Sequence, residues 1–485
     1  HGLTSAEIIR DYVFVTAGAC GPCRFGMYVT EYRKALRDAG FEGFRVLLFQ
    51  QTGGMKQATG EELGLELNPA FFWAILKGMF AGDVLNALGY RLRPYEKTLG
   101  DTDKKLEQAK QIVYDALHDK TNLLHAMWKV KPLMQSVEVD RTRPKPKVSI
   151  IGEFWAMTTE GDGNYQLQRF LEQEGAECDI QLVAAWMLYM LWEVKHDTLD
   201  RADLREHDEA KYGMAGSGPF GVAQRLAIHH AGDFAVRGFF QVLAHLAGLY
   251  GYSLPDMNEI ADKAEGFYSN DLRGGEGHME VGKLIVNVLH QKAHMTLSVK
   301  PFGCMPSASV SDGVQSAITE KFPGSIFCPV ETSGDGRVNF YSRVQMYLFK
   351  AKQAAAAELE RACEENGVTI EEVRAFLDTS PRMRSPLFKA RHVYAGTASD
   401  VVAAVAPYIK KTAAQRWKER AVAFVTGSRE VAKKSPHMVV KLAQTAVAEG
   451  PSVAKRALED VKLYRELRAQ KKAANDTVLD AAAED

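Results

Sequence analysis

Short apolar segments alternate with a helical pattern at the start of the chain. Residues 11–17 and 44–51 are short, apolar and rich in β-branched or aromatic side chains, which predicts buried strands. Between them, residues 24–40 have the apolar spacing of an amphipathic helix and end on Gly40, a typical helix C-cap. A strand, a helix and a strand in this order predict a β-α-β unit with parallel strands.

The same pattern starts again after a basic, proline-broken segment at residues 141–148. A strand is predicted at 147–152, a helix at 164–177 and a second strand at 178–185. Two more strands are expected within residues 293–306 and 325–336, each followed by a loop rich in Gly or Pro. Helices are predicted over 68–95 and 103–133. The best domain boundary lies at residue 146.

Strand patterns end near residue 345, and the remainder is typical of helices broken by glycine and proline. The predicted fold is therefore α/β, with two Rossmann-like lobes that contain parallel sheets and an all-helical C-terminal extension. The three expected domains are an N-terminal lobe at 1–145, a second lobe at 146–345 and a basic extension at 346–485.

Composition is that of a soluble globular protein. The 485 residues are 46% hydrophobic and 25% charged, and the net charge of −1 gives no reason to expect nucleic acid as a partner. The apolar run at 180–194 is shorter than the roughly 20 residues that span a bilayer, so it predicts a strand followed by a buried helix. We expect a cytoplasmic protein with no transmembrane segment.

The C-terminal extension differs electrostatically from the rest. Residues 410–472 contain sixteen Lys/Arg against six Asp/Glu, a net charge of +10 in a chain whose total is −1. Three interpretations stay open: a docking arm for an acidic partner or a second subunit, a solvated helix packed on the body, or weak association with an anionic membrane surface.

Two of the six cysteines form a Cys-Gly-Pro-Cys sequence between a predicted strand and a predicted helix. Cys20 and Cys23 would suit a thioredoxin-like dithiol, since a helix N-terminus lowers a cysteine pKa. However, Ala19 occupies the position where thioredoxins usually have tryptophan, and no strand–helix unit precedes this strand.

Two further cysteines, Cys304 and Cys328, are expected at the ends of strands. Because the carboxyl ends of parallel strands meet at one edge of a sheet, Cys20, Cys23, Cys304 and Cys328 are predicted to reach one cleft between the lobes. Four thiolates from loops suit zinc or a [4Fe–4S] cluster. Cys178 is expected to be a small buried residue of a strand, and Cys363 to lie on a polar helix face.

Four sequence blocks resemble one protein family. ACGPCRFGMY, FRVLLFQQ, GEGHMEVGKLI and VKPFGCMPS together resemble the activase-related part of the 2-hydroxyacyl-CoA dehydratase superfamily, and more distantly benzoyl-CoA reductase subunits and double-cubane cluster proteins. The resemblance covers roughly residues 5–345. It implies a [4Fe–4S] cluster between two α/β lobes, low-potential electron transfer under anaerobic conditions, and a homo- or hetero-oligomer.

The resemblance also implies an ATPase activator component, as a partner or as a fused upstream domain. None of the glycine-rich pieces EGDGN, GGEGH and SGDGR is a Walker phosphate loop. We therefore expect no ATPase in this chain. Glu153 and Glu276, in loops near the expected cluster, could bind substrate or move protons; equally, they could cap helices.

The resulting functional expectation is an iron–sulfur protein that relays or uses low-potential electrons. Two alternatives remain from the residues alone: a non-catalytic scaffold subunit with a structural cluster, and a thioredoxin-like dithiol protein. One histidine of the pair His229 and His230 is expected to be a buried core residue on a helix.

Overall fold

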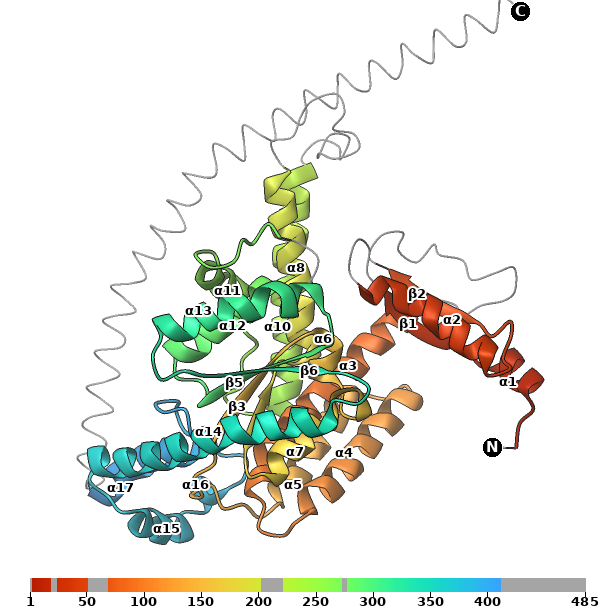
Figure 1. Cartoon of the computed structure of the whole chain (residues 1–485). Helices are drawn as coiled ribbons and strands as arrows, with labels where there is room; N and C mark the ends of the chain where they lie inside the picture. Colours follow the sequence, from red (N-terminus) through yellow and green to blue (C-terminus); the bar gives the residue numbers. More distant parts are fainter. Residues whose placement is uncertain (1, 19–23, 51–68, 202–220, 273–276, 411–485) are drawn as a thin grey trace, which may run out of the picture. The chain divides into compact units, whose positions relative to one another are not determined.

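The computed structural model describes residues 2–18, 24–50, 69–201, 221–272 and 277–410. It combines many helices with two parallel sheets, which confirms the predicted α/β class (Figure 1). By compactness, residues up to Ala184 together with Val242–Ala406 form one unit, and Ala185–Gln241 belong to another. The predicted boundaries at residues 146 and 346 stay predictions.

The N-terminal segment forms the predicted β-α-β unit. Strand β1 (Phe14–Gly18) pairs in parallel with β2 (Val46–Gln50), from Phe14 opposite Val46 to Gly18 opposite Gln50. Helix α2 (Tyr28–Asp38) connects them, after a 3₁₀ turn (η1, Arg24–Met27). Gly40 has a φ of 85°, the left-handed conformation expected just past a helix end. A short helix, α1 (Ser5–Asp11), precedes β1.

Three helices follow: α3 (Pro69–Leu92), α4 (Asp101–His118) and α5 (Leu123–Gln135). Within the described part of the chain, Pro69–Tyr95 is one helical stretch long and apolar enough, with a mean hydropathy of 1.3, to cross a membrane by length and composition. A buried core helix meets the same criterion. Asp83 near its middle is 6% exposed and accepts hydrogen bonds from the backbone N–H groups of Val183 and Ala184, at 3.1 and 2.7 Å.

The main sheet has four parallel strands in the order β4-β3-β5-β6. They are β3 (Lys147–Gly152), β4 (Glu177–Ile180), β5 (Met295–Pro301) and β6 (Ile326–Thr332). Strand β4 is shorter than the predicted 178–185, because helix α8 begins at Val183. The apolar run at 180–194 is thus the end of a strand followed by a helix, as predicted.

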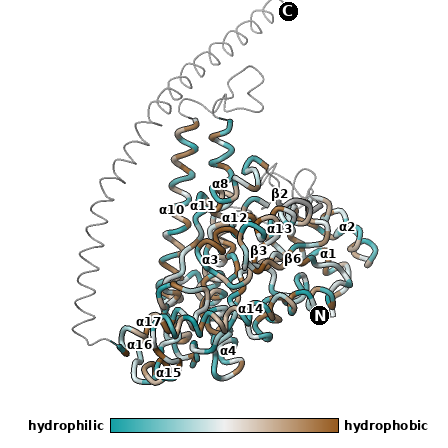
Figure 2. The backbone as a smooth tube through the Cα atoms, turned by 60° about the vertical axis from the view of Figure 1, so that its left-hand side comes forward, coloured by the Kyte–Doolittle hydropathy of each residue, from teal (hydrophilic) through white to brown (hydrophobic). Residues whose placement is uncertain are grey.

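Helices cover both faces of this sheet (Figure 1). On one face, α7 (Leu167–Gln173) and α14 (Arg337–Asn366) share a buried apolar core with the strands, to which α7 contributes Leu171 and α14 contributes Val344. On the other, α11 (Met257–Ala264), α12 (Gly277–Leu289) and α13 (Asp312–Lys321) pack against Phe327 of β6. Apolar residues concentrate in this layered region (Figure 2).

Two long helices, α8 (Val183–Asp200) and α10 (Gly221–Ala247), lie so close together that a Cβ atom at Gly232 would be 3.3 Å from the Leu191 side chain. Among the described residues, His230 is exposed and His229 is half-buried. The expectation that one of the pair is a buried core histidine is therefore wrong, since even His229 is only half-buried. The helix carries apolar residues on its exposed side, and the sequence pattern alone cannot distinguish these from buried ones.

After β6 the described chain is helical, as predicted: α14, α15 (Ile370–Thr379), α16 (Pro381–Arg384) and α17 (Thr397–Lys410). Arg141, which lies between α5 and β3, forms hydrogen bonds with the segment around α16. Its guanidinium donates hydrogen bonds to the carbonyls of Met383 at 2.6 Å and Ser385 at 2.9 Å. The rest of the basic extension, residues 411–485, lies outside the described residues.

Candidate functional site

The strand order of the main sheet defines a switch point. The chain passes from β3 to β4 on one side, then returns to place β5 on the other side of β3. Loops that leave neighbouring strands in opposite directions open a crevice at the carboxyl ends of those strands, where ligands of α/β proteins bind. The loops after β3 and β5 carry Glu153 and Cys304.

Glu153 is held by a tight turn at the end of β3. Gly152 has a φ of 126°, and a Cβ atom there would lie 2.0 Å from the carbonyl oxygen of Val299, so only glycine fits. The Glu153 N–H donates to that same oxygen at 3.0 Å. Its carboxylate accepts from the N–H of Ala156 at 2.8 Å and thereby caps the short helix α6 (Phe154–Thr158). The capping interpretation is confirmed; a catalytic role stays a prediction.

Cys304 lies three residues after the end of β5 at Pro301 and is the N-cap of a π-helical turn, η5 (Met305–Ser311). Gly303 before it has a φ of 72°, and the Cys304 carbonyl accepts from the N–H of Ala308 at 2.8 Å. The thiol is half-buried, with Sγ 3.6 Å from the hydroxyl oxygen of Ser307. Burial raises the pKa of Cys304 to about 11, and nearby Glu153 and Glu280 add to the shift. Single π-helical turns frequently occur at functional sites.

A buried acid lies next to Ser307. Glu280 of α12 is 2% exposed and accepts hydrogen bonds from the hydroxyls of Ser307 at 2.5 Å and Ser311 at 2.9 Å. Burial raises the pKa of Glu280 to about 7, although the two serines and Lys300 favour its charged form. The side chains of Cys304, Ser307 and Glu280 thus form one connected polar group at the carboxyl edge of the sheet.

Glu280 was not expected from the sequence. The acid expected near the site was Glu276, four residues earlier, which lies outside the described residues. The sequence does contain a signal for Glu280, which is its place on the apolar face of a helix. Glu280 is followed by Val281 and Leu284, which are buried on α12 as Glu280 is. An acidic residue on the buried face of an amphipathic helix requires hydrogen-bond partners, and here the two serines supply them.

Cys328 does not lie at a strand end, so that expectation is wrong. It is the third residue of β6, pairs with Leu297 of β5 and is fully buried in the core formed with α7 and α14. Strand β5 continues four residues beyond Leu297, which places Cys328 about 13 Å below the carboxyl edge. Burial raises its pKa to about 12. This position does not support a ligand role for Cys328.

Pro329, directly after Cys328, makes this strand look shorter than it is, because proline is rare inside strands. Among the described residues, strand β6 lies at the edge of the sheet and pairs with β5 alone. An edge strand tolerates proline because one side of it needs no hydrogen-bond donor. The strand therefore continues through Pro329 to Thr332.

The other cysteines are placed as follows. Cys178 is 4% exposed in β4, which confirms its prediction as a small buried residue. Cys363 lies half-buried on α14, as expected for a helix position. Cys20 and Cys23 lie outside the described residues. Of the four predicted cluster ligands, the described part of the chain thus shows one, Cys304, at the carboxyl edge.

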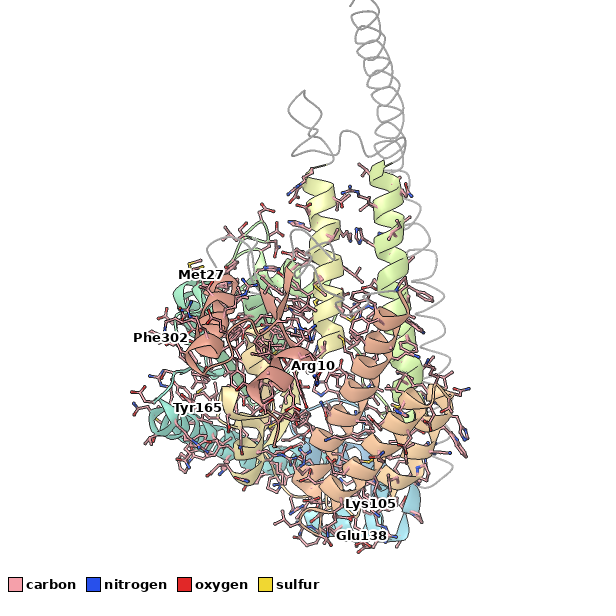
Figure 3. All side chains as sticks on the ribbon, turned by 90° about the vertical axis from the view of Figure 1, so that its right-hand side faces the viewer. Arg10, Met27, Lys105, Glu138, Tyr165 and Phe302 are labelled. Carbon is pink, nitrogen blue, oxygen red and sulfur yellow. The ribbon has the colours of Figure 1, made fainter. Side chains whose placement is uncertain are left out.

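A pocket of about 460 Å³ opens beside this region, at the carboxyl ends of β5 and β6 and the start of α14. Its lining includes Phe302, Asp312, Glu331, Ser333, Asn339 and Arg343. Figure 3 shows Phe302 at the surface of the molecule. Behind Ser333, the hydroxyl of Tyr165 contacts the Ser333 carbonyl and accepts from the Ser333 N–H at 3.0 Å, which fixes this loop.

Comparisons with known proteins gave no match: no family model, no curated protein and no solved structure is similar to this chain. The resemblance to the dehydratase superfamily therefore stays a prediction that depends on the four sequence blocks.

Proposed function

We propose that this chain is an iron–sulfur protein that relays or uses low-potential electrons in a system of the 2-hydroxyacyl-CoA dehydratase and activase type. The observation that carries the proposal is the position of Cys304. It lies in the loop at the β3/β5 switch point, half-buried, on a π-helical turn. Ligand-holding residues of α/β proteins occupy such positions.

The proposed ligands are Cys20, Cys23 and Cys304. By sequence, Cys20 and Cys23 lie between the end of β1 at Gly18 and the start of η1 at Arg24, again directly after a parallel strand. Two Rossmann-like lobes would then each contribute cysteines from the carboxyl end of a strand. Three thiolates would leave one iron of a [4Fe–4S] cluster without a cysteine ligand. The cluster, when bound, supplies one-electron transfer at low potential.

The free Cys304 thiol is a poor nucleophile. With a pKa raised to about 11, its thiol is protonated at neutral pH and reacts slowly. To bind iron, the Cys304 thiol would become a thiolate and give up that proton to solvent or to a nearby base. The dithiol alternative would need Cys20 and Cys23 only, so it gives Cys304 no role.

The proposal includes a separate ATPase that delivers the electrons, and an oligomeric assembly in the cytoplasm. The glycine-rich pieces of this chain lack the phosphate-loop pattern, so ATP hydrolysis is assigned to a partner or to a fused upstream domain.

The test is purification without oxygen, followed by iron, acid-labile sulfide and zinc analysis. We expect brown protein that contains about four iron and about four sulfide per chain, as a [4Fe–4S] cluster requires. Colourless protein with one equivalent of zinc and no sulfide would overturn the redox function.

A further inference from the structure

The pocket beside β6 and α14 has a charge pattern that the proposed electron-transfer function does not use. We propose that it binds a small zwitterionic molecule, one that carries a carboxylate and an ammonium group as an α-amino acid does. The inference depends on the pocket alone and does not require a cluster at Cys304.

The acidic side of the pocket is formed by Asp312 and Glu331. One carboxylate oxygen of Asp312 pairs with the ammonium of Lys300, whereas the other, Oδ1, is buried and has no hydrogen-bond partner among the described residues. A buried, unpaired carboxylate oxygen is costly and is usually satisfied by a ligand or water. Glu331 lies in β6 opposite Lys300 of β5. Lys300 is fully buried and cannot contact a ligand, whereas Glu331 lines the pocket, where its carboxylate suits an ammonium group.

The basic side is formed by Arg343 and the start of α14. Helix α14 is 30 residues long, yet its N-cap Gly336 offers no side-chain acceptor and its first turn contains no acidic residue. The N–H groups of a first helical turn favour an anion. Arg343, two turns along the same helix, donates to the carbonyl of Pro329 at 3.2 Å and has further N–H groups in its planar fork. Together they suit a carboxylate.

The size and walls of the pocket agree with a small ligand. Its volume of about 460 Å³ lies in the range of small-molecule sites. Phe340 and Phe302 add apolar side chains to the lining, and Phe302 is 65% exposed. The side chain of a bound amino acid would have these rings to contact, with the charged groups of the lining available for its carboxylate and ammonium.

The experiment is calorimetry on the full chain with each of the twenty L-α-amino acids. We expect at least one to bind with a Kd below about 1 mM, the weakest affinity that this method measures well. For that amino acid, the matched amine without the carboxylate and the matched acid without the amino group should bind at least about tenfold more weakly, since each loses one charged contact.

Two variants at exposed or partly exposed positions locate the site: Arg343→Gln and Glu331→Gln should each weaken binding at least about tenfold. Arg337→Gln is the matched control, because the Arg337 guanidinium lies over the Tyr341 ring, 5.4 Å from its centroid, and not in the pocket lining. Asp312→Asn is avoided, since it would leave Lys300 buried without its partner.

Three results would overturn the inference: no amino acid binds below about 1 mM, a fragment with one charge binds as well as the amino acid, or Arg337→Gln weakens binding as much as Arg343→Gln. Cys304→Ala should keep amino-acid binding. In the wild-type chain, amino-acid binding without iron would therefore contradict only the cluster function, and iron without amino-acid binding would contradict only this inference.

Discussion

The polar groups at the two edges of the main sheet differ in how many hydrogen-bond and ion-pair partners they have. At the amino edge, the first residues of β3 and β4 form a buried ion pair, with the Lys147 ammonium 3.3 Å from the Glu177 carboxylate. The second oxygen of Glu177 accepts hydrogen bonds from Tyr95 at 2.8 Å and Thr397 at 2.7 Å. At the carboxyl edge, Asp312 keeps a buried oxygen without a partner among the described residues, and Cys304 keeps a half-buried thiol.

This difference separates structural from functional polar groups. A buried charge with partners on every side stabilises one arrangement of the chain and leaves nothing for a ligand to bind. A buried polar atom without a partner requires an explanation, and a ligand is one. A buried oxygen without a hydrogen-bond partner also lies near Lys147, namely Oδ2 of Asp400, so the distinction applies to the ion pair itself. We infer that Lys147 and Glu177 contribute stability, and we propose binding at the carboxyl edge.

The largest effect is expected from Glu177→Ala at the amino edge. The substitution leaves Lys147 buried without its counter-charge, which typically costs about 3–5 kcal/mol of unfolding free energy. Chemical denaturation measures this loss. The double variant Lys147→Met, Glu177→Met should recover part of it, because no unpaired charge remains. A loss below about 1 kcal/mol for Glu177→Ala would contradict the claim that the Lys147–Glu177 pair stabilises the fold.

A smaller, pH-dependent effect is expected from Glu280 at the carboxyl edge. Its pKa is raised to about 7 in the folded chain, so the folded state holds a proton that the unfolded state releases near pH 4. The stability from this proton is fully present below pH 4 and is lost as the pH rises to about 7, by up to about 3 kcal/mol. Denaturation at several pH values should show this decline in the wild-type chain relative to Glu280→Gln. Equal pH dependence in the two proteins would contradict the assigned pKa.

The smallest effect is expected from Glu153→Ala. The variant loses the helix cap on α6, which typically costs about 1 kcal/mol. If Glu153 acts only as a cap, Glu153→Gln should leave iron content and the reduction potential unchanged. A shift of the reduction potential in a stable Glu153→Gln variant would support the catalytic prediction for Glu153.

Much of the fold was predictable because its signals are local. The strands at 147–152 and 44–51 and the helix between residues 24 and 40 follow directly from apolar spacing and a terminal glycine. Where a strand ends depends also on the strands beside it, which the local sequence does not show. Pro329 looks like a strand end in the sequence, and only the pairing of β6 with a single neighbour explains why it is not.

The candidate site was predictable only in part. Cys304 was found from its place after an apolar strand, whereas Glu280 was missed because its partners, Ser307 and Ser311, lie 27 and 31 residues away. Hydrogen bonds over such separations leave no periodic signal in one sequence. The pocket beside α14 depends in the same way on residues that several separate elements bring together.

The measurement that tests the central claim most directly compares Cys304→Ala with Cys328→Ala after purification without oxygen. Both replace a thiol by a methyl group, one at the carboxyl edge and one in the core. Far-ultraviolet circular dichroism first confirms that each variant is folded. The account predicts that Cys304→Ala loses most of its iron and sulfide and that Cys328→Ala keeps the wild-type content. Retained iron in Cys304→Ala, or its loss from folded Cys328→Ala, would contradict it.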